Sequence, residues 1–119
     1  MHVESIRRYC LSLPGAKEKL QWGETLCFKI GEKLFATVDL DVSSKVRLAL
    51  KCTPEEFAEL MERDGIRPAP YVGRYHWAGL ERLDSVEDEE LEELIRASYD
   101  IVSAKISRKL RKAPKRKKR

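Results

Sequence analysis

The stretch Arg67-Pro-Ala-Pro-Tyr-Val-Gly-Arg-Tyr-His-Trp-Ala-Gly-Leu-Glu-Arg-Leu-Asp84 is the part of the chain around which the fold is organised. Pro68 and Pro70 have no backbone amide to donate, which confines the beginning of this stretch to an edge strand or a fixed loop. Residues 75–83 contain no proline and can pair along their whole length. We therefore expect an edge segment that leads into a paired strand.

Upstream of this stretch, three segments alternate apolar and polar residues with the period of two that strands show. They are residues 25–30, 33–40 and 45–51. In the second segment the alternation puts Leu34 on the core face and Phe35 on the opposite face. The third segment has leucines on its inner face and lysine and arginine on its outer face. Gly31 allows a tight turn between the first two segments, so this part of the sheet is predicted to be antiparallel.

Helical spacing of apolar residues predicts a first helix over residues 3–13. The sequence Thr53-Pro-Glu-Glu56 predicts the start of a second helix, because the threonine oxygen caps a backbone amide while the last glutamate reaches back. A third helix is expected to begin near Ser85 and to end at Pro114. Residues 16–24 are mostly polar and are predicted to form a loop or a turn of helix over the rim of the core.

The order of elements is therefore helix, three strands, helix, two strands, helix. Because hairpin-length connections join the first three strands, we predict an α+β fold, a two-layer α-β3-α-β2-α sandwich. Its sheet is antiparallel and its helices lie on one face. The other face is left partly open, and this is where a site is expected. Residues 1–110 form this domain, and residues 111–119 form a basic tail that is predicted to be disordered.

Length and composition limit the class of protein. A chain of 119 residues suits one domain with a single core. No apolar run reaches the length of a transmembrane helix or of a signal-peptide core, and the cytoplasm is the expected location. Cys10, Cys27 and Cys52 lie far apart and are expected to be reduced, buried thiols.

Charge is distributed unevenly along the chain. Residues 105–119 contain ten Lys or Arg and no acid, whereas residues 1–104 contain fourteen basic and twenty acidic residues. A basic arm on an acidic body is typical of proteins that bind anions. The most frequent partner is nucleic acid, and a membrane surface or an acidic protein is less frequent.

Five separated motifs resemble the MmcQ/YjbR-like family in their order and spacing. They are Tyr9-Cys-Leu-Ser-Leu-Pro-Gly15, Gly31-Glu-Lys-Leu-Phe35, Leu50-Lys-Cys-Thr-Pro-Glu55, Pro68-Ala-Pro-Tyr71 leading to His76-Trp77, and Ser98-Tyr99. The resemblance covers residues 3–110 and implies a two-layer sandwich of the same element order, likened to secretion chaperones and to CyaY-like folds. Members are commonly described as predicted DNA-binding proteins of double-wing type, which implies DNA binding but no catalytic residues. The basic residues 105–119 are not part of the core pattern of the family.

The sequence contains no recognisable motif for catalysis or for a cofactor. His76 beside Trp77 suggests a general base, but no serine or cysteine stands in a nucleophile motif, and a structural histidine is favoured. Both glycine-rich phosphate-binding patterns are missing. The acids of residues 87–93 are predicted to form a solvated helix face rather than a cation site. We therefore predict a protein that is not an enzyme and that needs no cofactor or metal. An enzyme that acts on a small molecule is a third alternative, for the case that Tyr71, His76 and Trp77 line one pocket.

Arginine and aromatic residues interleave in the opening stretch in a way that suits stacking on bases and binding of phosphates. The predicted nucleic-acid-binding residues are Lys45, Arg47, Arg67, Tyr71, Arg74, Tyr75, Lys115, Arg116, Lys117, Lys118 and Arg119. A structural interpretation of the rings is the alternative: Trp77 closes the core between helices and sheet, and Tyr71 latches its loop. For the basic tail, the alternative is an arm that only increases solubility.

Two functions follow from these patterns. The first is a small, non-catalytic protein that binds DNA or another nucleic acid through its basic tail and the basic, aromatic rim of its sheet. The second is a protein-interaction or chaperone-like module, a homodimer that uses the open sheet face or a strand edge. A membrane is not expected as a partner.

Overall fold

The computed structural model describes the backbone of residues 1–117 and the side chains of residues 1–107. Helices and strands follow one another in this part of the chain as α1 (Val3–Ser12), β1 (Ala16–Gln21), β2 (Thr25–Ile30), β3 (Lys33–Asp39), β4 (Leu48–Lys51), α2 (Pro54–Leu60), β5 (Ile66–Pro68), the short 3-10 helix η1 (Gly73–Tyr75), β6 (Trp77–Leu80) and α3 (Asp88–Lys117). The strands form one antiparallel sheet with the order β1-β2-β3-β4-β6-β5.

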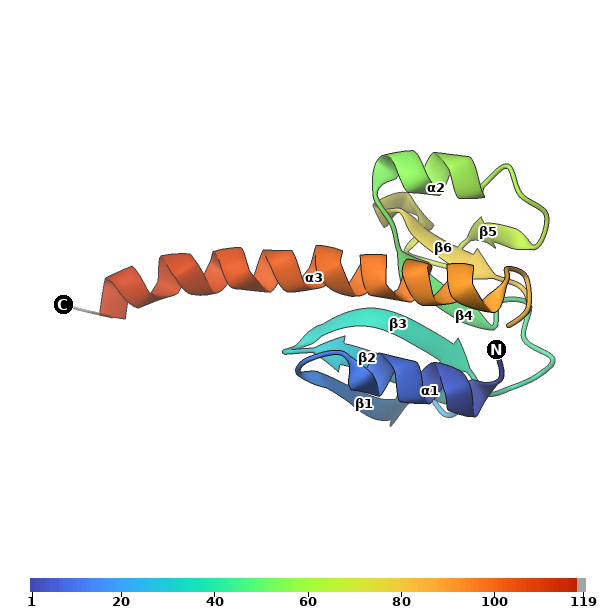
Figure 1. Cartoon of the computed structure of the whole chain (residues 1–119), viewed down its shortest axis with the longest axis horizontal. Helices are drawn as coiled ribbons and strands as arrows, with labels where there is room; N and C mark the ends of the chain where they lie inside the picture. Colours follow the sequence, from blue (N-terminus) through green and yellow to red (C-terminus); the bar gives the residue numbers. More distant parts are fainter. Residues whose placement is uncertain (118–119) are drawn as a thin grey trace.

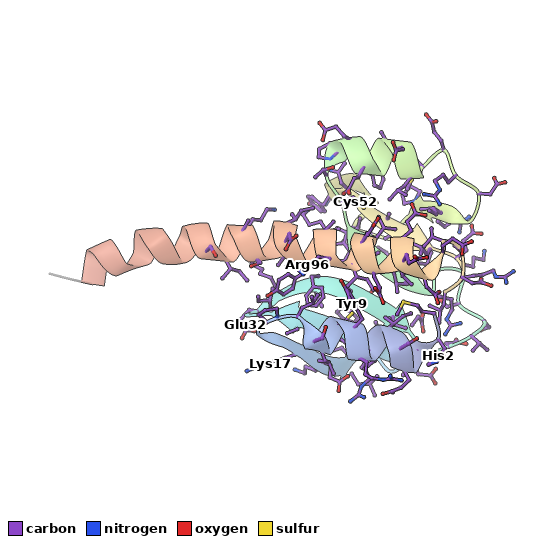
Figure 2. The ribbon with its side chains drawn as sticks, in the orientation of Figure 1. His2, Tyr9, Lys17, Glu32, Cys52 and Arg96 are labelled. Atoms are coloured by element: carbon purple, nitrogen blue, oxygen red, sulfur yellow. The ribbon has the colours of Figure 1, made fainter. Side chains whose placement is uncertain are left out.

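The helices α1 and α3 run side by side over one face of this sheet (Figure 1). Tyr9 of α1 and Arg96 of α3 lie where the two helices meet (Figure 2). Between the helices and the sheet lies the core, whose largest fully buried side chains include Phe28, Phe35, Leu50, Leu91 and Ile95. The predicted α+β sandwich with an antiparallel sheet is confirmed.

In the described part of the chain, β1 is the one strand that the predicted order lacks. Residues 16–21 pair with β2 along their whole length, so this segment is a strand and not the loop or helical turn expected for residues 16–24. Its sequence, Ala-Lys-Glu-Lys-Leu-Gln, has no clear apolar alternation, because β1 is an edge strand in which no residue is fully buried. Charged residues, lysine above all, are common on edge strands because they prevent pairing with other chains.

A β-bulge in β3 changes which side chains face the core. Phe28 of β2 pairs with Ala36, but the next residue, Lys29, pairs with Leu34, so Phe35 is an extra residue in β3. Phe35 is fully buried in the core, and Leu34 lies on the open face of the sheet, where it lines a pocket. The prediction for these two residues is therefore wrong, because strict alternation does not account for an inserted residue.

Ser98 of α3 completes the hydrogen bonding of the sheet beside this bulge. Its hydroxyl donates to the carbonyl oxygen of Phe35 at 2.6 Å and accepts from the backbone amide of Lys51 at 3.0 Å. Both backbone groups lie just beyond the pairs that join β3 to β4, so each of them needs another partner. The neighbouring Tyr99 donates its hydroxyl to the carbonyl oxygen of Pro14, which ties α3 to the turn before β1.

The start of α2 confirms the predicted capping box. The hydroxyl of Thr53 accepts from the amide of Glu56 at 3.1 Å, and the carboxylate of Glu56 accepts from the amide of Thr53 at 3.3 Å. Pro54 is the first helical residue, where its missing amide is not needed. The cap fixes where the chain turns out of β4.

Helix α3 extends well beyond the sheet. The molecule measures 53 Å along its longest axis and 29 and 26 Å along the others, and Figure 1 shows the C-terminal part of α3 projecting from the body. The helix continues to Lys117, so the prediction that it ends at Pro114 is wrong. A proline inside a helix has no amide to donate, here to the carbonyl oxygen of residue 110, but the other residues of the helix keep their donors. Lys118 and Arg119 lie outside the described residues, and the disorder of the tail stays a prediction.

Candidate functional site

A pocket of about 740 Å³ lies on the face of the sheet that α1 and α3 leave uncovered. We call it the open-face groove. It is lined by Trp22, Thr25, Leu34, Thr37, Asp39, Ser44, Lys45, Val46, Arg47, Leu48, Ala49, Arg67, Ala69, Pro70, Tyr71, Val72 and Trp77. These residues come from both edges of the sheet and from its centre, so the groove crosses β3 and β4 between walls contributed by the β1–β2 turn and by the segment after β5. Its volume is in the range typical of ligand sites.

The floor of the groove consists of short side chains. Thr37 of β3 and Ala49 of β4 are directly paired, and Thr25 lies on the neighbouring β2. The alternation of the strands that buries Val38 and Leu50 under the helices turns these residues to the opposite face. The side chains are small at the centre and large at the rim, and this leaves a hollow over the sheet. Large side chains at the centre would fill it.

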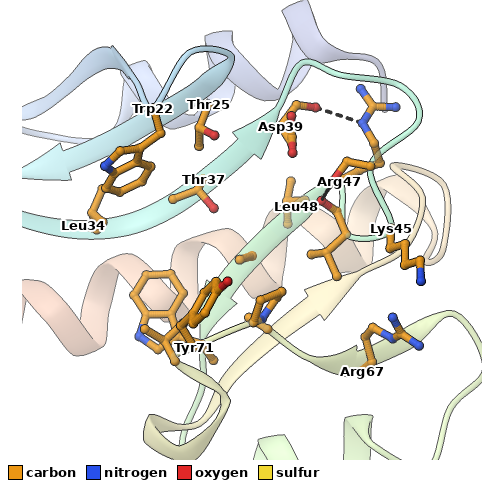
Figure 3. A pocket seen from close by; sticks show the side chains of 17 residues that line it. Trp22, Thr25, Leu34, Thr37, Asp39, Lys45, Arg47, Leu48, Arg67 and Tyr71 are labelled. Atoms are coloured by element: carbon orange, nitrogen blue, oxygen red, sulfur yellow. Dashed lines mark hydrogen bonds between the residues drawn. The ribbon is translucent and has the colours of Figure 1, made fainter.

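Aromatic rings form the walls at two sides (Figure 3). Trp22 stands in the β1–β2 turn with 70% of its surface exposed, and Tyr71 stands in the loop before η1 with 96% exposed. Trp77, the first residue of β6, is half-buried in the groove and is not part of the core. The structural interpretation of the rings is therefore wrong, because Trp77 does not close the core between helices and sheet. The exposure of Tyr71 argues equally against a latch.

Trp22 and Tyr71 share an unusual backbone conformation. Their φ angles are 52° and 68°, in the left-handed region that residues with a side chain rarely adopt. Such a conformation costs on the order of 1–3 kcal/mol, and it persists only where the surrounding structure imposes it. In the described part of the chain, neither ring has an aromatic partner or a side-chain hydrogen bond. The fold thus holds two large rings in the solvent without using them for packing.

Three cations of the predicted site meet at the groove. Lys45 is exposed, and Arg47 donates from Nε to the backbone oxygen of Asp39 at 2.9 Å, which fixes its stem along the rim (Figure 3). Arg67 of β5 forms a partly exposed ion pair with Glu81 at 3.3 Å. Asp39 is the one carboxylate that lines the groove, so positive charge is in excess there. Lys45, Arg47, Arg67 and Tyr71 are brought together as the sequence suggested.

Two predicted site residues with described side chains, Arg74 and Tyr75, do not line the groove. Arg74 and Tyr75 belong to η1, where the guanidinium lies 5.0 Å from the centre of the tyrosine ring. Next to them, Lys51 donates from Nζ to the carbonyl oxygen of Tyr75 at 2.9 Å. Burial, together with the charge of Lys105, lowers the pKa of Lys51. The side chains of Lys115, Arg116, Lys117, Lys118 and Arg119 lie outside the described residues.

The features that would support catalysis do not come together. His76 takes a left-handed conformation and packs its ring edge-on against Phe57 of α2 with centroids 5.5 Å apart, so it does not share the groove with Tyr71 and Trp77. Burial raises the pKa of Cys10 to about 12 and that of Cys52 to about 11, so neither thiol is an effective nucleophile near neutral pH.

Metal binding and membrane insertion are two further possibilities for the described residues. Within residues 1–107, no three histidine, cysteine or acidic side chains gather as a metal-binding group. None of the helices in the described part of the chain combines the length and the apolar character needed to cross a bilayer.

Sequence reasoning missed the floor of the groove and Trp22. Threonine and alanine on strands give no signal by themselves, and Asp39 and Val46 resemble ordinary strand ends. The dipeptide Trp22-Gly23 is a usable signal, since Gly23 also has a positive φ and allows a tight turn between two strands. Recognising this turn would have placed an exposed tryptophan at the end of a hairpin.

The sequence of the chain is similar to those of known proteins. The sequence model described as YjbR matches residues 11–101. The protein named "Uncharacterized protein YjbR" of Escherichia coli strain K12 is 30% identical over 103 residues, which cover 83% of this chain and 85% of that protein. The protein of the same name from strain O157:H7 gives the same values.

Two solved structures are similar in fold. The crystal structure of Deinococcus radiodurans protein DR2400, described with the domain DUF419, has a TM-score of 0.75 at 31% identity. The similarity covers 85% of this chain and 78% of the DR2400 chain. A crystal structure of a protein from Pseudomonas syringae has a TM-score of 0.72 at 20% identity. The similarity covers 86% of this chain and 99% of that protein's chain. The second likeness concerns the fold alone. The basic residues 105–119 all lie beyond the matched residues 11–101.

Proposed function

The chain belongs to the YjbR family, and we propose that this member is a non-catalytic protein that binds nucleic acid with its open-face groove and its basic C-terminal segment. The observation that carries the proposal is the convergence on one hollow with exposed aromatic rings of Lys45 and Arg47, from the segment before β4, and Arg67 from β5. Lysine and arginine bind phosphates, and rings stack on bases. Residues 105–119 add ten positive charges and no negative one.

The two parts of this surface act differently. The charges of the C-terminal segment attract any polyanion and release its counterions, so this contribution does not depend on sequence and decreases with salt. The cations of the groove line the same hollow as the rings, so they bind the phosphate backbone while the rings stack on the bases. The acidic remainder of the body repels a polyanion elsewhere, which favours the groove and the C-terminal segment as the contact surface.

A charge-removal experiment tests the proposal. The double variant Lys45→Gln/Arg67→Gln removes two exposed groove cations, and Arg8→Gln/Lys33→Gln removes two exposed cations that do not line the groove. Fluorescence anisotropy with a 12-nucleotide DNA is measured from 50 to 200 mM salt. The groove variant is expected to reduce the slope of log affinity against log salt by about 1.4, equivalent to two phosphate contacts on a single strand.

The control variant is expected to leave this slope near the wild-type value. Absence of binding by the wild-type protein to both single-stranded and duplex DNA at 50 mM salt would refute the proposal. An equal change in slope for both double variants would show that only the overall charge matters. The groove would then have no part in nucleic-acid binding.

A second candidate function is supported by apolar side chains near the groove. Leu40 and Val42 follow β3 with 37% and 81% of their surfaces exposed, close in sequence to the basic rim. Exposed apolar residues of this kind suit a protein interface, and a second copy of the chain is one partner that fits. Light scattering over a wide concentration range tests it: a molar mass that doubles supports a dimer, and a constant monomer mass contradicts it.

A further inference from the structure

We propose that the open-face groove accepts unpaired bases, so that this protein binds single strands in preference to duplexes. The inference rests on the proposed function and specifies its ligand. Three observations carry it: the exposure of Trp22 and Tyr71, their position on opposite sides of one hollow, and the cations that line the same hollow farther along it.

The exposed rings of the groove are available for stacking. Trp22 and Tyr71 lack aromatic partners within residues 1–107, and Trp77 adds a third, half-buried ring on the same face. A base offers its own face to such a ring only when it is not stacked in a duplex. A double helix presents base edges and phosphates, which require cations and hydrogen-bonding groups but no free aromatic surface.

The course and the charge of the groove agree with binding of a single nucleic-acid strand. Its walls stand on opposite edges of the sheet, one in the β1–β2 turn and one after β5, so an occupant crosses β3 and β4 over a floor of threonine and alanine. Lys45 and Arg47 lie on the same rim and supply positive charge for the phosphates that follow a stacked base. Because positive charge is in excess along the groove, its charge favours an anionic occupant over an uncharged one.

Glycine variants test the rings without disturbing the backbone. Trp22→Gly and Tyr71→Gly remove a ring at a position whose left-handed conformation suits glycine, so folding is expected to be retained. The matched control is Tyr75→Ala, because Tyr75 is a nearby tyrosine with 52% exposure that does not line the groove. Thermal unfolding of all three variants verifies that each is folded.

Binding is measured by fluorescence anisotropy with a thymidine 12-mer and with a 12-base-pair duplex at 50 mM salt. We expect the wild-type protein to bind the single strand more tightly than the duplex. Each glycine variant should lose about five- to hundredfold in affinity for the single strand, as expected for one stacked base, with less than a twofold change for the duplex. Tyr75→Ala should bind both DNAs like the wild-type protein.

The outcomes separate this inference from the proposed function. If the wild-type protein binds DNA but the glycine variants bind the single strand unchanged, the groove does not stack bases, and the inference is wrong while nucleic-acid binding stands. Competition with thymidine monophosphate is a second test, in which the 12-mer concentration is expressed per nucleotide. If the monophosphate displaces the 12-mer at the same concentration at which the 12-mer binds, the groove is a mononucleotide site, and the inference is wrong. If the wild-type protein binds neither DNA, both conclusions fail.

Discussion

Replacing Ser98 by alanine tests whether α3 supplies part of the hydrogen bonding between β3 and β4. The substitution leaves the buried carbonyl oxygen of Phe35 and the partly buried amide of Lys51 without a partner. An unpaired buried backbone group costs about 1–3 kcal/mol, and the amide of Lys51 is reached in part by water. Alanine regains roughly 0.5 kcal/mol of helix propensity. The expected loss in the free energy of unfolding is therefore about 2–3 kcal/mol.

Urea unfolding followed by circular dichroism measures this loss. For a domain of this size, it should lower the unfolding midpoint by roughly 1–2 M without changing the slope. Ser103→Ala is the matched control, because Ser103 lies on the same helix, is half-buried and makes no side-chain hydrogen bond within the described residues. If the two variants differ by less than about 0.5 kcal/mol, the hydroxyl of Ser98 does not support the sheet and the reasoning is refuted.

Three further predictions concern stability and reactivity. Thr53→Ala removes the cap of α2 and should destabilise the protein by about 1 kcal/mol in urea unfolding; no change would contradict the capping box. The hydrogen bonds and charge of Arg63 lower the pKa of Glu90, so this pair stabilises the fold above the ordinary glutamate pKa of about 4.3 and loses its effect as pH falls through the lower folded value. The difference in unfolding free energy between the wild type and Glu90→Gln, about 0.5–1 kcal/mol for a pair this exposed, should therefore shrink between pH 5 and pH 3; a constant difference would contradict it. All three cysteines are buried, so a thiol reagent should modify none in the native protein and all of them in urea, and fast native labelling would contradict their burial.

The fold was largely predictable because most of its elements have strong local signals. The box at residues 53–56 predicts the start of α2, and the alternation over residues 25–30 predicts β2. Strand β1 has no such signal, since an edge strand needs no apolar face, and only its pairing with β2 reveals it. The bulge at Phe35 depends on packing under α3, and the extension of α3 past Pro114 contradicts a rule that usually holds.

The candidate site was predictable in part. Lys45 and Arg47 were identified as cations on the outer face of a strand, and Arg67 as a cation interleaved with aromatic residues; all three line the groove. Trp77 was ambiguous, because a ring at the start of a strand suits the core and the open face equally, and only the alternation of β6 assigns it to the groove. Trp22 was missed together with β1, because its position follows from a hairpin turn that had not been recognised.

Mapping of a 12-nucleotide single strand on the ¹⁵N-labelled protein by NMR tests the role of the open-face groove most directly. If the groove binds nucleic acid, backbone amide shifts should change at Trp22, Thr37, Ala49 and Tyr71 as the strand is added, together with shifts in the basic C-terminal segment. Changes confined to that segment, or centred on α1 across the sheet from the groove, would contradict the account.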